Sequence, residues 1–269
     1  MTHTPGGRDE PTPPDPGPPA VRGELTERLA RIEALLLTPA RGGLTGAEHR
    51  FEPAWRRATR GETRWASSAA VLLVAVVQLT LPARLSVQPR PLMPAVEVAL
   101  LVCLVALSPY RIERRSPLYR GLGLVLTFTV GGANAYSVVR LVDGLVRGTE
   151  GGSAGRLLLT GGTVWLINMV IFGLGYWELD RGGPAARAHG ERPAPDFLFV
   201  QMQSPELAPE HWEPAFLDYL YLSFTNSTAF SPTDVMPMTR TAKVWMLVQS
   251  AVSLITLVLV VARAVNILG

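Results

Sequence analysis

The sequence has little of what an enzyme site, a metal site or a disulfide framework requires. Its one cysteine, Cys103, allows no internal disulfide and is best read as a small hydrophobic residue. The four histidines are scattered in the tail and loops without metal-ligand spacing. No phosphate-binding glycine loop and no nucleophile with an adjacent base can be picked out. We therefore expect no catalytic residues, no metal, no cofactor and no nucleic-acid partner.

Charge is scarce as well, and long apolar segments take its place. Charged residues make up 17% of the 269 positions, whereas hydrophobic residues make up 48%. About 20 consecutive apolar residues cross a bilayer as a helix. Five windows meet this condition, although the second carries Glu97 near its start: Trp65–Ala83, Pro91–Tyr110, Gly121–Val139, Leu157–Trp177 and Val244–Ala262. They predict an all-α, multi-pass integral membrane protein of the plasma membrane, with the lipid bilayer as its main partner.

The N-terminal part has a different composition from the rest. Residues 1–23 are rich in proline and have no apolar run, so we expect a disordered tail. Residues 24–40 predict an amphipathic or short coiled-coil helix, because apolar residues recur there at spacings of four, three and four. The mixed charges of its polar face favour a protein partner over lipid, and self-association is open.

Arginine placement predicts the orientation of the chain. If all five windows cross, and counting from Arg41 onward, fifteen basic residues lie on the side of the N-terminus and six lie on the other side. Basic residues accumulate on the cytoplasmic side, so the N-terminus is predicted to be cytoplasmic. We divide the membrane part into a three-helix region, 65–146, and a second module, 155–268. The long acidic connection 178–213 within that module either caps a pore mouth or is a solvated linker.

The segment before the last apolar window predicts a re-entrant loop. Residues Glu213–Phe224, "EPAFLDYLYLSF", form an apolar helix of about 18 Å, roughly half of a hydrocarbon core of about 30 Å. The polar stretch that follows, "TNSTAFSPTDVMP", contains Pro232, which stops a helix. Irregular backbone at membrane depth is stable only when it is buried in protein or lines a water-filled cavity.

This order of a short helix, a polar loop and a long apolar helix resembles the pore module of the tetrameric potassium-channel superfamily. The family pattern is roughly "TTxTTVGYGDxxP", and Thr225, Thr228, Asp234 and Pro237 match it. The chain end also looks like that of a group of bacterial membrane proteins whose C-terminal part is potassium-channel-like. The resemblance covers about 213–268. It implies a homotetramer and monovalent cations as possible ligands.

The selectivity filter of that family is degenerate in this chain. Ser231, Pro232 and Thr233 stand where the family has Gly-Tyr-Gly, and glycine permits backbone angles that other residues resist. We therefore expect weak selectivity, with hydroxyls and freed carbonyls coordinating a partly hydrated cation. The candidate filter-like residues are Thr225, Ser227, Thr228, Ser231, Thr233 and Asp234. The alternative is a structural plug whose hydroxyls bond to their own backbone.

Other intramembrane polar groups are predicted to line the pore or to pair. Gln249, Ser253 and Thr256 share one face of the last helix, which suits either a water-lined cavity or the packing of helices. Glu97 and Arg140 fall at similar depth in antiparallel neighbouring spans, so we predict an intramembrane ion pair. Two separate interfacial residues are the alternative.

The leading functional expectation is an oligomeric, weakly selective cation channel. The competing class is a non-conducting membrane scaffold or sensor with a channel-like fold, and a small-solute transporter is a third class. A cytoplasmic N-terminus makes the loop enter from the cytoplasm, opposite to the potassium-channel family. An inverted pore, a sixth span formed by residues 214–231 or an outside N-terminus would each resolve this conflict.

Overall fold

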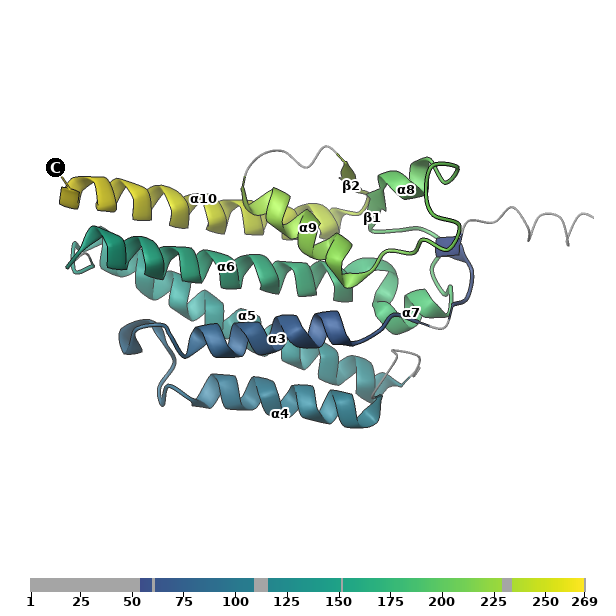
Figure 1. Cartoon of the computed structure of the whole chain (residues 1–269), viewed down its shortest axis with the longest axis horizontal. Coiled ribbons are helices and arrows are strands. Elements are labelled where there is room, and N and C mark those ends of the chain that lie inside the picture. The colour runs from purple at the N-terminus through teal and green to yellow at the C-terminus, as the bar shows by residue number, and fades with distance from the viewer. Residues whose placement is uncertain (1–53, 60, 109–115, 151, 229–233, 269) are drawn as a thin grey trace, which may run out of the picture. The chain divides into compact units, whose positions relative to one another are not determined.

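The computed structural model describes residues 54–59, 61–108, 116–150, 152–228 and 234–268 (Figure 1). All of them belong to one compact unit, Glu52–Gly269. The predicted tail 1–23 and the predicted helix 24–40 lie outside the described residues.

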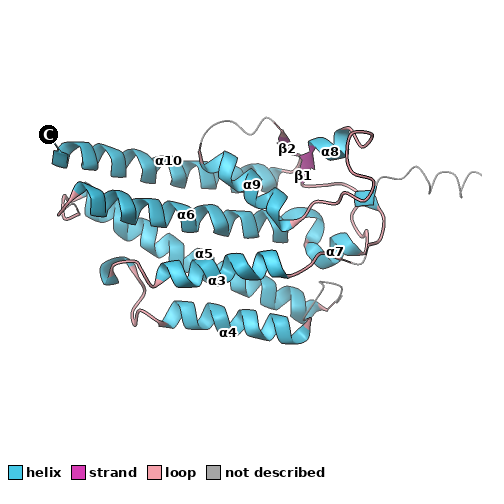
Figure 2. Cartoon of the chain, viewed as in Figure 1, coloured by secondary structure: helices cyan, strands magenta, loops and turns pink. Residues whose placement is uncertain are grey.

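Most of the described chain is helical, as the sequence predicts. Five long helices coincide with the five apolar windows, and a pair of three-residue strands is the only sheet among the described residues (Figure 2). The long helices are α3 (Trp65–Gln78), α4 (Leu92–Leu107), α5 (Pro117–Val146), α6 (Ala154–Leu179) and α10 (Arg240–Leu268). The short 3-10 turns η1 (Ala54–Arg56) and η2 (Ala83–Leu85) flank α3.

Local sequence signals set where the long helices begin. Pro117 occupies the first turn of α5, where its missing N–H costs nothing. Ser153 caps α6, because its side chain accepts a hydrogen bond from the Arg156 N–H at 3.4 Å. Both helices then continue through long apolar segments.

Three of the helices are long and apolar enough to cross a membrane by themselves. They are α5, α10 and α6 together with the 3-10 turn η3 (Asp180–Gly182). The helices α3 and α4 have 14 and 16 residues, or about 21 and 24 Å at 1.5 Å per residue. A membrane location agrees with this finding, while five crossings and a cytoplasmic N-terminus remain predictions.

Helix α6 lies at the centre of the bundle. It packs against α10, α9 (Phe216–Ser227), α5 and α3. Of its most apolar window 56% is buried, against 22% for α10. Glycines allow these close approaches: a Cβ at Gly173 would lie 3.2 Å from the Leu220 backbone, and one at Gly175 would lie 2.8 Å from the Trp245 ring.

The connection between α6 and α9 is folded and is not an open linker. It contains η3, α7 (Pro184–Ala188), β1 (Phe197–Phe199) and α8 (Val200–Gln203). Strand β1 pairs antiparallel with β2 (Val235–Pro237), with Phe197 opposite Pro237. We call the end of the bundle that holds β1 and β2 the strand end, and the other end the opposite end (Figure 1).

The five long helices alternate in direction between these two ends (Figure 1). At the strand end, Glu62, just before α3, bonds to the end of α6, and Arg120 in the first turn of α5 donates to the Gly182 carbonyl. At the opposite end, Arg263 near the end of α10 donates to the Glu150 carbonyl just after α5. The helix starts of α3, α5, α9 and α10 therefore share the strand end.

Candidate functional site

Helix α9 begins at the strand end and the chain after it returns there. Its first turn is fixed by Asp218, whose carboxylate accepts a hydrogen bond from the Ala215 N–H at 2.8 Å. Beyond α9, the pairing of β2 with β1 brings the chain back beside the segment that precedes α9. Asp196 secures this return, because its carbonyl accepts from the Met238 N–H and its carboxylate from the Thr239 hydroxyl, both at 2.8 Å. The path from α9 to β2 thus starts in the bundle and ends at the strand end.

The described hydroxyls of the filter-like loop are engaged inside the protein. The Thr225 hydroxyl donates to the Leu222 carbonyl at 2.9 Å, and the Thr228 hydroxyl donates to the Thr225 carbonyl at 3.0 Å. Ser227 is buried and accepts a hydrogen bond from α10, as described below. These three positions therefore fit the alternative in which hydroxyls bond to nearby protein groups.

Three further residues of the predicted filter-like loop lie after α9. Ser231 and Thr233 lie outside the described residues. Asp234 is half-buried, and its carboxylate interacts with the hydroxyl of Tyr221, an exposed residue of α9. Asp234 is therefore the one charged group of the loop that the structure describes.

Gln249 of α10 is the centre of a buried polar cluster. Its amide nitrogen lies 2.6 Å from each of the Ser223 and Ser227 hydroxyls and 2.9 Å from the Ser223 carbonyl. Its amide oxygen accepts from the Asn226 amide at 2.9 Å and from the Tyr176 hydroxyl. The side chain is 0% exposed. One amide group thus ties α10 to α9 and to α6.

A second polar chain lies one turn further along α10. The Ser253 hydroxyl accepts from the Asn168 amide at 3.1 Å, and the Asn168 oxygen accepts from the Asn134 amide at 3.2 Å. Thr256 is buried as well, and its hydroxyl has no hydrogen-bond partner among the described residues. The Gln249 cluster and this second set of hydrogen bonds together join the buried faces of α5, α6, α9 and α10.

The predicted inner-helix residues therefore face the interior of their own chain. Gln249, Ser253 and Thr256 are each at most 2% exposed. Large exposed side chains of α10 are apolar instead and include Val244, Leu247, Leu254, Val258 and Val261. The three polar residues lie together on the buried side of α10. Their position is the one that the helix-packing alternative describes.

Glu97 and Arg140 are not brought together. The Glu97 carboxylate is 0% exposed and accepts from the Gln78 amide of α3 at 2.8 Å. Arg140 instead donates to the Arg84 carbonyl at 3.2 Å. The ion pair at this end joins Arg84 to Glu150, with two nitrogen–oxygen distances of 2.5 Å. The predicted pair is therefore not formed: Glu97 bonds to Gln78 of α3, and Arg140 bonds to a backbone carbonyl.

The strand end holds a dense cluster of buried charged groups that sequence reasoning missed. Asp180 accepts from the Asp196 N–H at 2.7 Å and from the Tyr219 hydroxyl at 2.6 Å. Arg181 has a positive φ of 53° and donates to the Trp55 carbonyl at 2.5 Å. Arg187 donates to the Asp180 carbonyl at 3.0 Å. The available signal is the charged run at the end of an apolar window, which the sequence leaves open as a cap on a pore mouth or a solvated linker.

Glu62 connects the segment before α3 to this cluster. One carboxylate oxygen accepts from the Phe216 N–H at 2.5 Å, and the other accepts from the Trp177 indole N–H at 2.6 Å. Burial raises the pKa of Glu62, and its two hydrogen bonds oppose that rise. The first turn of α9 is therefore held by a residue far away in the sequence.

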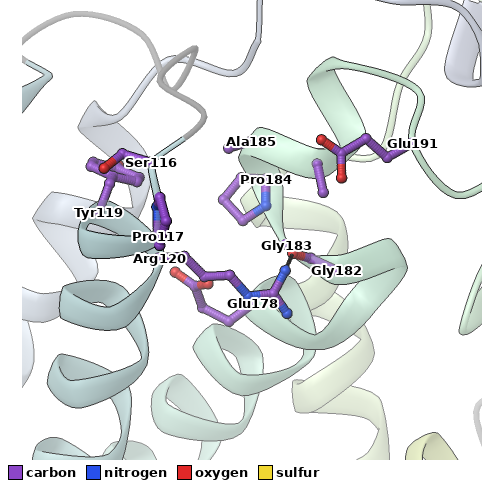
Figure 3. Close-up of a pocket in the computed structure, with 11 residues that line it drawn as sticks. Ser116, Pro117, Tyr119, Arg120, Glu178, Gly182, Gly183, Pro184, Ala185 and Glu191 are labelled. Atoms are coloured by element: carbon purple, nitrogen blue, oxygen red, sulfur yellow. Dashed lines mark hydrogen bonds between the residues drawn. The ribbon is translucent and has the colours of Figure 1, made fainter.

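A cavity of about 220 Å³ opens between the start of α5 and the corner after α6 (Figure 3). Glu178 and Arg120 lie side by side in it, and Arg120 donates to the Gly182 carbonyl. Pro117, Pro184 and short side chains form much of the remaining wall.

No family model matches the chain, and neither curated proteins nor solved structures give a match. The described geometry offers buried polar clusters, a short helix followed by a returning chain, and this cavity.

Proposed function

We propose that the chain is a pore-loop membrane protein that assembles into an oligomer and passes monovalent cations with weak selectivity. The observation that carries this proposal is the path of α9. A 12-residue helix starts at the strand end, and strand β2 returns the chain to the same end. With α3, α4, α5, α6 and α10 crossing the membrane, α9 and the following loop would be re-entrant. The tetrameric state comes from the resemblance to potassium channels.

In this proposal the lining comes from the loop and not from α10. The C-terminal end of α9 directs the partial negative charge of a helix terminus towards the loop, which favours cations. Asp234 adds a full negative charge at the mouth. Ser231, Pro232 and Thr233 lack the glycines of a potassium filter, and therefore the ion would keep part of its water shell. Gln249 would hold α9 and α6 against α10 without contacting ions.

The proposed pore has the opposite polarity to that of potassium channels. The starts of α3 and α9 share the strand end, and the arginine bias predicts that this end is cytoplasmic. The loop would then enter from the cytoplasm, as in ionotropic glutamate receptors. The short length of α9 favours this inverted arrangement over a sixth crossing, because 12 residues span about 18 Å.

A non-conducting scaffold or sensor is the second candidate, and one observation favours it. The polar residues of α10 face inwards, so α10 presents mainly apolar side chains to its surroundings. An oligomer built around such a face would have an apolar central cavity. In that case the strand end, with its folded connection, would carry the function by binding a partner.

Single-channel recording from purified protein in planar bilayers tests the proposal. We expect cation-selective currents whose reversal potentials discriminate little between sodium and potassium. Asp234→Asn should lower the cation conductance, because it removes charge at the mouth. Thr228→Val should change conductance or selectivity, because it removes a hydroxyl from the loop.

Two matched variants serve as controls. Thr163→Val removes a hydroxyl that bonds to the Leu159 carbonyl of its own helix at 2.8 Å, away from the loop. Glu206→Gln removes an exposed carboxylate at the strand end. The absence of current under varied voltage, pH and cation would leave the scaffold as the better explanation. Currents that respond equally to loop and control variants would contradict the loop as the lining.

A further inference from the structure

The cavity of about 220 Å³ lies where α5 begins and where α6 ends (Figure 3). These helices are two of the three that are long and apolar enough to cross a membrane. The residues that line the cavity come from the stretches 116–120 and 178–191, which stand just outside the apolar windows of the two helices. In a bilayer this is the level of the lipid head groups, where the hydrocarbon core gives way to polar groups.

Glu178, in the last turn of α6, brings an unpaired carboxylate to this cavity. Among the described residues, neither of its oxygens has a hydrogen-bond or ion-pair partner. The side chain is half-buried, and neither oxygen is sealed off from solvent inside the protein. The carboxylate lies against two glycines, because a Cβ at Gly123 would be 2.8 Å from Oε1 and one at Gly183 would be 3.4 Å from Oε2. Burying part of a charged group without a partner is costly, so this carboxylate favours a ligand that donates to it.

Arg120 places a guanidinium group beside this carboxylate (Figure 3). Its Nη1 donates to the Gly182 carbonyl, which holds the side chain across the cavity. A guanidinium group has several further N–H donors, and the Arg120 side chain makes no other hydrogen bond to the described residues. The cavity therefore contains one positive and one negative group, which lie side by side without pairing.

The charges around Glu178 favour neither a simple cation nor a simple anion. Arg64, Arg120 and Arg187 all act electrostatically on Glu178, and none of them forms an ion pair with it in the described structure, so there is no excess of negative charge to attract a cation. Glu191, at the exposed edge, has an interaction partner of its own. An anion on Arg120 alone would lie beside the Glu178 carboxylate, and like charges repel. A ligand that carries an ammonium and an anionic group together satisfies both side chains.

We propose that this cavity binds a zwitterionic head group, with a primary ammonium on Glu178 and a phosphate on Arg120. A volume of about 220 Å³ equals that of about seven water molecules in the liquid, at roughly 30 Å³ each, which suits a small polar group. Pro117, Pro184 and short side chains leave the remaining wall largely apolar, which suits the carbon atoms between the two charges. Phosphatidylethanolamine offers this chemistry at head-group depth, and free phosphoethanolamine offers the same chemistry from solution. The inference does not depend on the proposed channel function.

Thermal unfolding of the purified full chain in mixed lipid–detergent micelles tests the site. Phosphatidylethanolamine is compared with phosphatidylglycerol, which lacks the ammonium, and with phosphatidylcholine, whose quaternary nitrogen has no N–H to donate. A ligand that binds the folded state raises the unfolding temperature, and we expect a saturable rise of several degrees with phosphatidylethanolamine only. Free phosphoethanolamine, added without lipid, distinguishes the sources. A rise with the free compound assigns the site to a soluble ligand, and a rise with the lipid alone assigns it to the membrane.

Glu178→Gln keeps the shape of the side chain but removes its charge. It should raise the half-saturating fraction of phosphatidylethanolamine roughly tenfold. In detergent alone it should fold at least as stably as the native chain, because it removes an unpaired carboxylate. Glu206→Gln is the matched control, because it removes an exposed carboxylate at the same end that does not line the cavity.

Equal unfolding temperatures with the three lipids, together with no response to phosphoethanolamine, would overturn the proposal. A phosphatidylethanolamine effect that Glu178→Gln leaves unchanged would place the head group elsewhere and would also overturn it. Lipids with successive methyl groups on the head-group nitrogen give a test that needs no variant. The rise in unfolding temperature should shrink with each added methyl group, and an unchanged rise would contradict the contact between the ammonium and Glu178.

Discussion

At the scale of single residues, Gln249 shows how one amide group can organise a helix bundle. It uses both its nitrogen and its oxygen, and its partners lie on two other helices. A long polar side chain is costly against lipid, so it is stable only where such partners exist. The sequence marks Gln249 as unusual, but the serines and the asparagine that satisfy it stand on another helix.

The substitution Gln249→Leu should destabilise the fold. A leucine side chain at this position would leave the Ser223 and Ser227 hydroxyls and the Asn226 amide without their partner. We expect a loss of about 1–3 kcal/mol in the free energy of unfolding. Equilibrium unfolding in mixed detergent, followed by circular dichroism, measures it.

Leu247→Ala is the control for this substitution, because Leu247 is 68% exposed on the same helix. It should change the free energy of unfolding by less than about 0.5 kcal/mol. Equal losses for the two variants would mean that the Gln249 cluster contributes no more to stability than an exposed side chain of the same helix.

At the scale of elements, α6 is the helix against which α9 and α10 are placed. Individual glycines of α6 matter because they leave room for a neighbouring helix at a particular contact. A Cβ at Gly161 would lie 2.7 Å from two Val260 methyl groups, whereas a Cβ at Gly162 would meet nothing within 4 Å. The contact between α6 and α10 therefore depends on the first of two adjacent glycines.

Gly161→Ala and Gly162→Ala should have different effects on the free energy of unfolding. Alanine favours helix over glycine by about 1 kcal/mol, so Gly162→Ala should stabilise slightly or be neutral. Gly161→Ala should lower the free energy of unfolding by about 1–3 kcal/mol, because the added methyl group overlaps with Val260. The same unfolding assay compares them. Adding Val260→Ala to Gly161→Ala should recover part of the loss, and failure to do so would contradict this packing.

The periodicity of the sequence predicted the elements better than the contacts between them. Each of the five apolar windows is a helix, because hydrophobic runs of that length have few other stable forms. Periodicity also placed Gln249, Ser253 and Thr256 on one face. It carries no information on which neighbour that face meets, since the rotation of a helix about its axis depends on all the helices that pack against it. The same ambiguity explains Glu97, which bonds to Gln78 of α3 and not to an arginine of α5.

The charged cluster at the strand end was unpredictable for a related reason. Its members come from residues before α3, after α6 and before α9. Single charges in a loop are normally solvated, and only the folded connection reveals that Asp180 and Arg181 are buried. Nothing in their local sequence distinguishes them from the exposed acids of the same segment.

At the scale of the whole molecule, the two ends of the bundle differ in character. The strand end holds the folded connection, the buried charges and the start of α9. The opposite end holds short turns and the Arg84–Glu150 ion pair. This asymmetry allows a topology test that does not depend on knowing which end is cytoplasmic.

Single-cysteine labelling should sort residues by end. In a Cys103→Ser background, Glu206→Cys should react with a membrane-impermeant maleimide from one side of the membrane. Thr149→Cys and Asn266→Cys should both react from the other side, because both residues are exposed at the opposite end. Labelling of intact and of opened cells measures this. Reaction of positions 206 and 266 from the same side would mean either that α10 does not cross or that residues 214–231 form a sixth crossing.

The bond between Glu62 and the Phe216 N–H also has a consequence for biosynthesis. The two partners stand 154 residues apart, and Arg181 reaches the Trp55 carbonyl across 126 residues. A ribosome that has completed α3 must therefore still make α4, α5, α6 and the start of α9 before the segment ahead of α3 can find its last partner. Long-range closure of this kind is slow compared with local helix formation. The strand end therefore cannot close before the start of α9 has been made, and until then its carboxylate and arginines are open to water and to chaperones.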